Sequence, residues 1–170
     1  MLQLKKKPGA GEILFALYCL ILVWLVLFKF TFSFTDIPWF AGPRRINFIP
    51  FYYDTDVGGF HLREVLMNAV IFIPFGIFLK MFDLPAGKIV LSGFLFSLSL
   101  ELLQFALAIG AGDVTDLITN TAGTAAGVCI YLLMRKIFAD KARTDRIIQV
   151  TAAAFLVLFS VLALLLYIAN

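Results

Sequence analysis

Long apolar runs separated by short polar segments dominate this sequence. Crossing the hydrocarbon core of a bilayer takes about 20 consecutive apolar residues in a helix. Five runs reach or approach that length: Ile13–Phe34, Val65–Phe82, Ile89–Ile109, Leu117–Met134 and Ile147–Ala169. The second and fourth are the shortest, which suggests polar helix ends or a thinner bilayer at one surface. The pattern predicts an all-α, polytopic membrane helix bundle of about five transmembrane helices.

The links between these runs are short, with one exception that spans Thr35 to Glu64. Helices joined by short links usually lie side by side and antiparallel. We therefore expect a single domain over residues 1–170, with a core at residues 13–134 and an additional C-terminal transmembrane helix at residues 147–169. The first run exceeds the ~7–15 apolar residues of a signal peptide, so it is expected to remain as an uncleaved membrane anchor.

The composition supports a membrane protein. Of the 170 residues, 62% are hydrophobic and only 15% are charged, whereas soluble domains are roughly half apolar and a quarter charged. The net charge of +3 does not indicate nucleic-acid binding, because the basic residues flank the apolar runs and accompany no recognition motif. Cys19 and Cys129 each lie inside an apolar run and suggest neither a disulfide nor a metal pair.

The distribution of lysine and arginine predicts the orientation. Ten of these residues lie on the side of the N-terminus and four on the opposite side. The first group is Lys5, Lys6, Lys7, Lys80, Lys88, Arg135, Lys136, Lys141, Arg143 and Arg146, and the second is Lys29, Arg44, Arg45 and Arg63. Because cytoplasmic segments carry the excess of basic residues, we expect the N-terminus in the cytoplasm and the C-terminus outside.

Glu101 is the most unusual residue, because it lies inside the run Ile89–Ile109. It is about eight residues below the expected outer end, roughly 12 Å deep at 1.5 Å per residue. A carboxylate at membrane depth costs at least ~2.5 kcal/mol and by default marks a functional site. Other polar residues gather at the outer ends of neighbouring runs: Glu64, Asn68, Gln104, Asp113, Asp116 and Asn120. Since spacings of three and four place residues on one helix face, we predict an outward-facing polar pocket.

The long outer segment combines aromatic residues with two arginines over Trp39–Tyr53. Aromatic rings and guanidinium groups suit the headgroup region of a membrane. We expect part of this segment to lie over the pocket as an interfacial or re-entrant segment. The predicted binding set therefore adds Arg44, Arg45, Asn47, His61 and Arg63 to the polar residues named above.

Three local patterns predict structure rather than chemistry. Pro74 lies in the middle of a predicted helix and is expected to kink it, because proline removes a backbone hydrogen bond. Gly123 and Gly127 form a GxxxG pattern that allows close helix packing within the bundle, with dimerisation as the alternative. Asp113 or Asp116 is expected to cap the helix that follows the turn, since a carboxylate bonds free N–H groups there.

These residues together resemble the VanZ-like family of bacterial membrane proteins. The matching pieces are Asn47-Phe48-Ile49-Pro50-Phe51, Asn68-x-x-x-Phe72-Ile73-Pro74-Phe75-Gly76, Glu101-x-x-Gln104 and Asp113-x-x-Asp116-x-x-x-Asn120-x-x-Gly123. Members usually carry an arginine shortly before the two aspartates, and this chain has none there. The resemblance implies a multi-pass protein of the bacterial inner, or cytoplasmic, membrane, in a family named for resistance to the glycopeptide teicoplanin.

The leading hypothesis is a non-enzymatic protein that binds an amphiphile of the cell envelope in this pocket. The expected partner is a membrane lipid or lipid-linked cell-wall intermediate, with a glycopeptide antibiotic as a second candidate. An alternative is an enzyme acting on such a lipid, with Glu101 or Asp116 as catalytic base; a small transporter is the third. Glu101 could also be a protonated structural contact within the bundle, bonded to Gln104, Asn120 or Asn68. A metal held by carboxylates and His61 lacks a compact motif, so neither metal nor cofactor is expected.

Overall fold

The computed structural model describes residues 8–28, 37, 39–42, 46–51, 62–110 and 112–169. These residues form five helices and two short strands, in the order α1 (Ala10–Leu27), β1 (Ile46–Asn47), α2 (Leu62–Met81), α3 (Ala86–Leu107), β2 (Gly112–Asp113), α4 (Val114–Phe138) and α5 (Lys141–Ala169). All five helices are long and apolar enough to span a membrane, which confirms the predicted all-α membrane bundle. Arg44, Arg45 and His61 of the predicted site lie outside the described residues.

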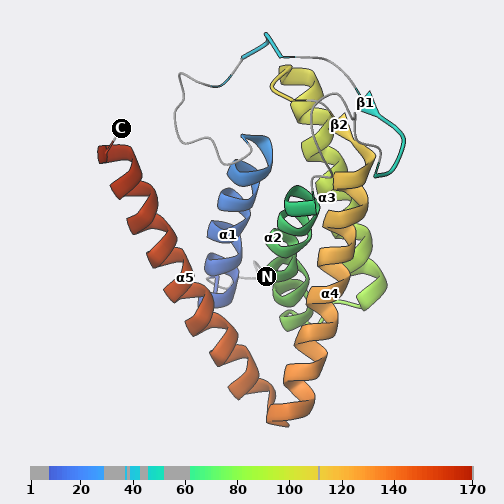
Figure 1. Ribbon diagram of the computed structural model, residues 1–170. Helices are drawn as coiled ribbons and strands as arrows, with labels where there is room; N and C mark the ends of the chain where they lie inside the picture. The colour runs from blue at the N-terminus through green and yellow to red at the C-terminus, as the bar shows by residue number, and fades with distance from the viewer. Residues whose placement is uncertain are drawn as a thin grey trace, which may run out of the picture.

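The five helices run up and down between two ends of the molecule (Figure 1). We call the end that carries β1 and β2 the loop end, and the end where α4 turns into α5 the elbow end. Helices α2, α3 and α4 pack together, with α1 alongside them, while α5 leaves the elbow and diverges from the bundle (Figure 1). The chain begins α1 at the elbow end and finishes α5 at the loop end (Figure 1).

Glycines allow α2 and α4 to approach closely. A Cβ atom added to Gly123 would overlap the carbonyl oxygen of Ala69, and one added to Gly127 would overlap that of Ile73. From the other side, a Cβ on Gly76 would overlap the Thr124 carbonyl oxygen. The GxxxG pattern therefore packs inside the bundle, as predicted, because small residues bring helix backbones together where lipid supplies no hydrophobic driving force.

Helices α2 and α4, like the other three, begin earlier than their apolar runs indicated. Helix α2 has 20 residues and α4 has 25, and both carry an acidic residue in the first turn, in agreement with the expectation of polar helix ends. Helix α4 includes its polar beginning because Asp113 is the N-cap: its Oδ1 accepts a hydrogen bond of 2.7 Å from the Thr115 N–H. The cap satisfies a free N–H group at the start of the helix, so the helix can begin in polar residues that a hydropathy pattern does not mark as helical.

Aromatic side chains fill the space between α1 and α2. Phe72 is fully buried, and Phe75 and Phe78 follow it along α2 toward the elbow end. Tyr18 of α1 packs against Phe78 and donates a 2.6 Å hydrogen bond to the carbonyl of Ile71. This contact ties α1 to α2 three residues before Pro74, and α2 continues through that proline to Met81.

Candidate functional site

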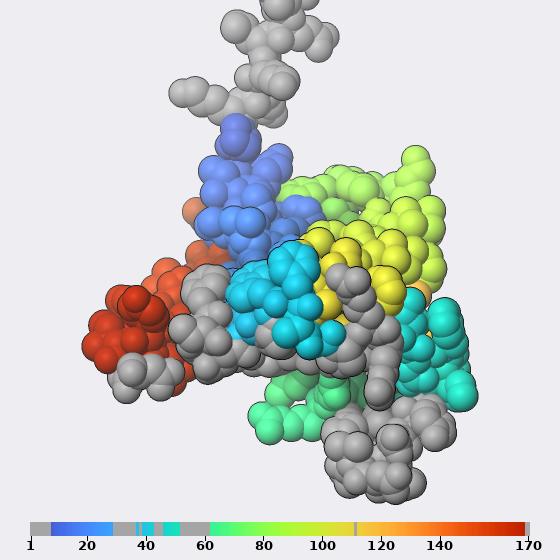
Figure 2. Space-filling view, turned by 90° about the horizontal axis from the view of Figure 1, so that it is seen from above, coloured from blue at the N-terminus to red at the C-terminus, as the bar shows by residue number. Residues whose placement is uncertain are grey.

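The outer segment is held on the turn between α3 and α4 by backbone hydrogen bonds. Strands β1 and β2 pair in parallel, with Ile46 opposite Gly112 and Asn47 opposite Asp113. Earlier in the segment, the Gly42 N–H donates to the carbonyl of Ala108 at 2.8 Å. Seen from the loop end, residues 39–42 lie against the end of α3, and residues 46–51 lie at the rim beyond them (Figure 2). Part of the predicted covering segment thus crosses the end of the bundle.

Asp113 is the centre of the polar contacts at the loop end. Its Oδ2 accepts a hydrogen bond from the Asn47 side-chain amide at 3.2 Å, while its Oδ1 caps α4. Its backbone N–H donates to Oε2 of Glu101 at 3.0 Å. Asn47 in turn accepts a hydrogen bond from the Ile49 N–H at 3.0 Å. One residue therefore joins β1, α3 and the start of α4.

Glu101 is buried, with 8% of its surface exposed, and it reaches the beginning of α4. The sequence placed this carboxylate far from any helix end and suggested Gln104, Asn120 or Asn68 as its structural partner. That expectation was incomplete, because Gly112 and Asp113 turn back alongside α3 and bring a backbone N–H to the Glu101 carboxylate. A backbone N–H is a donor that suits an anionic acceptor at a helix start.

A second carboxylate contact joins α2 to α4. The Asn68 side-chain amide donates to Oδ1 of Asp116 at 2.6 Å. Both side chains are half-buried, and Asn68 lies one turn after Glu64 along α2. Arg63 is exposed at the start of the same helix. The prediction that α2 and α4 present polar side chains at one level holds for Asn68 and Asp116.

Gln104 and Asn120 point into the bundle rather than toward Asp113. The Gln104 amide donates to the carbonyl of Val26 in α1 at 2.8 Å, and the Asn120 amide donates to Oγ of Ser97 at 2.9 Å. Each residue is only 1% exposed. Their side-chain carbonyl oxygens have no hydrogen-bond partner among the described residues. Both side-chain amides therefore connect helices, and each keeps one buried carbonyl oxygen that accepts no hydrogen bond from the described residues.

Ser97 and Thr115 also take part in these contacts, although neither is among the predicted site residues. Ser97 is fully buried and lies one turn before Glu101 on the same face of α3, opposite Asn120. The spacing of four between Ser97 and Glu101 was the available signal in the sequence, since it places both side chains on one face of a helix. Thr115 accepts a 3.0 Å hydrogen bond from the Phe51 N–H, so it also holds the outer segment. No pattern in the sequence predicts that contact.

The structure thus brings Asn47, Glu101 and Asp113 together and pairs Asn68 with Asp116. The chemistry offered is that of carboxylates and amides, which bind hydroxyl, amide and ammonium groups. Within the described part of the chain there is no group of three or more His, Cys, Asp or Glu residues that could hold a metal ion.

The family model described as VanZ/LLP1 matches residues 15–135. The chain belongs to the VanZ/LLP1 family. It is 40% identical over 150 residues to Protein VanZ of Enterococcus faecium, which covers 87% of this chain and 89% of the relative. The family match spans α1 to α4 and stops before α5. No solved structure matches the chain.

Proposed function

We propose that this VanZ-family protein binds the polar head of an amphiphilic cell-envelope molecule at the loop end. The observation that carries the proposal is the convergence of Asn47, Glu101 and Asp113 from three separate segments. Burying a carboxylate at membrane depth costs free energy, so such residues are rare and usually mark a functional site. The proposal extends to teicoplanin or a lipid-linked cell-wall intermediate, in line with the resistance for which the family is named.

Exposed apolar side chains beside these polar groups favour an amphiphile over a purely polar ligand. Phe48 is 75% exposed and Ile49 is 59% exposed, and both follow Asn47 directly. Phe51 is also exposed on the same segment, which Thr115 holds in place. Exposed aromatic residues at a membrane surface contact acyl chains and headgroups alike. A ligand with a polar head and a hydrocarbon tail would use both kinds of surface.

The carboxylate and amide groups would contact hydroxyl, amide or ammonium groups of the head. Glu101 and Asp116 lie on different helices, and each already holds a neighbouring segment by a hydrogen bond. A ligand that bonds either carboxylate would therefore also act on the packing of α4. In this proposal Arg44, Arg45 and Arg63 contribute phosphate or carboxylate contacts, because arginine binds such groups through paired N–H donors.

The test replaces Glu101 by glutamine and compares it with the same change at Glu12. Glu12 is an exposed glutamate in the first turn of α1, near the elbow end. Glu101→Gln keeps the shape and an acceptor for the Asp113 N–H but removes the negative charge. We expect the Glu101→Gln protein to fold but to lose the ligand that co-purifies with the wild type, as measured by native mass spectrometry. The Glu12→Gln protein should retain it.

The same pair of variants is tested for teicoplanin susceptibility in a susceptible bacterial host. Glu101→Gln is expected to lose any protection that the wild type confers, while Glu12→Gln keeps it. A Glu101→Gln protein that melts like the wild type and keeps both ligand and protection would refute a role for the charge. Turnover of an added lipid-linked precursor by the wild type, lost in Glu101→Gln, would favour an enzyme over a binding protein.

A further inference from the structure

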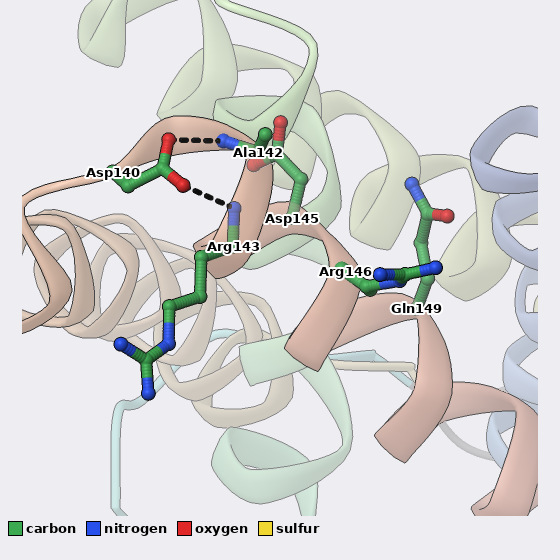
Figure 3. A pocket seen from close by; sticks show the side chains of 6 residues that line it. All are labelled: Asp140, Ala142, Arg143, Asp145, Arg146 and Gln149. Carbon is green, nitrogen blue, oxygen red and sulfur yellow. Dashed lines mark hydrogen bonds between the residues drawn. The ribbon is translucent and has the colours of Figure 1, made fainter.

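A second candidate site lies at the elbow end, opposite the polar contacts described above. Helix α4 ends at Phe138, and Lys141 begins α5 after a turn of two residues. A cavity of about 570 Å³ opens at this turn (Figure 3). It is lined by Asp140, Ala142, Arg143, Asp145, Arg146 and Gln149. Neither the family match nor the proposed function assigns a role to this cavity.

The two carboxylates of the cavity are already engaged by the protein. Asp140 accepts hydrogen bonds from the Ala142 and Arg143 N–H groups at 3.1 and 3.2 Å, which Figure 3 shows as dashed lines. Asp145 accepts from the Tyr131 hydroxyl at 2.9 Å and from the Lys141 ammonium at 3.1 Å. The backbone N–H groups of Ala142 and Arg143 are therefore satisfied by Asp140 and are not available to an anion.

The arginines of the cavity remain available to a ligand. Arg143 and Arg146 are exposed, and within the described residues their guanidinium groups form no hydrogen bond or ion pair. Arg143 lies over the ring of Phe138, with 5.6 Å between the guanidinium carbon and the ring centroid. In Figure 3 the Arg146 side chain lies beside Gln149, whose amide can also donate a hydrogen bond. The available donors of the cavity therefore favour an anion.

An apolar stripe leads away from the cavity along α5. Val150, one turn beyond Arg146, is 63% exposed, and the same face continues with exposed Val157, Val161, Leu164 and Ile168. On the other side of the cavity, Ile137 at the end of α4 is 65% exposed. Helix α5 diverges from the bundle (Figure 1), and the exposed fractions of these side chains show that the stripe is uncovered in the described part of the chain. Two exposed guanidinium groups at the head of an apolar stripe, beside carboxylates that the protein itself already engages, match a phosphate joined to an acyl chain.

We propose that the elbow cavity binds the phosphate of an anionic phospholipid, whose acyl chain lies along the exposed stripe of α5. Basic pockets at the ends of transmembrane helices bind anionic headgroups, and the cytoplasmic leaflet is rich in such lipids. The basic residues of the chain predict that the elbow end faces the cytoplasm. The bound lipid would cover the side of α5 that the bundle leaves open.

The experiment measures lipid binding to the full-length protein, delipidated in a neutral detergent, by native mass spectrometry. Phosphatidylglycerol and phosphatidylcholine with identical acyl chains are titrated in turn. The wild type is expected to bind one phosphatidylglycerol more tightly than phosphatidylcholine. The double variant Arg143→Gln/Arg146→Gln should weaken phosphatidylglycerol binding about tenfold or more, since each basic residue near an anionic surface contributes measurably to the affinity.

The matched control is the double variant Lys88→Gln/Lys136→Gln, which removes the same charge from exposed residues at the elbow end outside the cavity. It should change the affinity by less than about twofold. An equal loss in both double variants would reduce the effect to net surface charge and overturn the proposal. A wild type that binds both lipids equally would also overturn it.

A variant that fills the cavity without changing the charge gives an independent test. Ala142 lines the cavity and is exposed, and only its backbone bonds Asp140. Ala142→Trp should therefore fold, keep both arginines and still weaken phosphatidylglycerol binding, whereas unchanged binding would overturn the proposal.

Inorganic phosphate is the last probe. If phosphate alone binds in an arginine-dependent way and the acyl chains add no affinity, the ligand of the cavity is a water-soluble anion, and the proposal of a bound phospholipid is overturned.

Discussion

Two parts of this molecule, the loop end of α2–α4 and helix α5, are held in opposite ways. At the loop end, glycines bring α2 and α4 together and side-chain hydrogen bonds such as Asn68–Asp116 and Asn120–Ser97 connect the helices. Helix α5 is apolar over most of its length and leaves nearly all of its large side chains exposed beyond Leu156. Both regions are hydrophobic enough to span a membrane.

The difference shows that apolar composition places a helix in a membrane but does not attach it to other helices. Lipid tails are as apolar as leucine, so association depends on close packing of small residues and on polar contacts. Among the described residues, the polar contacts of α5 with other parts of the chain lie near its base. There Lys141 donates to the carbonyl of Met81 at 2.8 Å and pairs with Asp83 and Asp145. The first half of α5 is therefore held to the bundle, whereas beyond Leu156 most of its large side chains are exposed.

Of the changes within these two regions, the largest effect is expected from enlarging a glycine between α2 and α4. Gly123→Val would force its side chain into the Ala69 backbone, which cannot move aside as a flexible side chain could. We expect a loss of stability of about 3 kcal/mol, at the upper end of overpacking effects, seen as a large fall in melting temperature in detergent. Gly87→Ala is the control, because nothing lies within 4 Å of its added Cβ. It should be neutral or slightly stabilising.

Breaking the polar contact between the same two helices should have a smaller effect. Asn68→Ala removes the donor to a half-buried carboxylate, so we expect a loss of about 1–3 kcal/mol. Asp116→Ala and the double variant complete a mutant cycle. If the hydrogen bond holds the helices, the cycle should show a coupling of at least about 0.5 kcal/mol. Additive losses would mean that the glycine contacts alone hold α2 against α4.

Loosening the base of α5 should cost about 1 kcal/mol or less, because its contacts are partly exposed. Lys141→Met removes the hydrogen bond to Met81 and both ion pairs at once. Hydrogen exchange should speed up at the start of α5, while α2–α4 stay protected. The exposed Lys136 provides the control, and Lys136→Met should leave exchange unchanged. Faster exchange throughout α4 would show that the base of α5 supports the whole bundle.

The smallest effect is expected on the exposed half of α5. Leu158 is 67% exposed, so Leu158→Ala should change the stability in detergent by no more than about 0.5 kcal/mol. The same substitution at the fully buried Leu22 of α1 is the reference and should cost about 2–5 kcal/mol. Comparable losses at both positions would mean that another surface, such as a second copy of the chain, covers α5.

The fold class could be predicted because hydropathy is a property of each segment by itself. The five spans follow from runs of apolar residues long enough to cross a bilayer, whatever their neighbours. The close packing through Gly123 and Gly127 could also be predicted from the segment alone, because two small residues spaced by four leave room for another helix on one face. The position of Asp113 at a helix start was also visible, as a carboxylate after a glycine-rich turn.

The partners of the polar residues were decided only by the tertiary structure. Glu101 bonds the Asp113 backbone because the chain turns back after Ala108, and Gln104, one turn from Glu101, faces α1 instead. The rotation of α3 about its axis determines which of these side chains meets which neighbour, and many distant packing contacts determine that rotation. The sequence by itself therefore determined which segments are long and apolar enough to span a membrane. The packing decided which of them touch and why α5 stands apart, because hydrogen bonds and close contacts depend on how the helices are placed, whereas transfer into lipid depends on each segment alone.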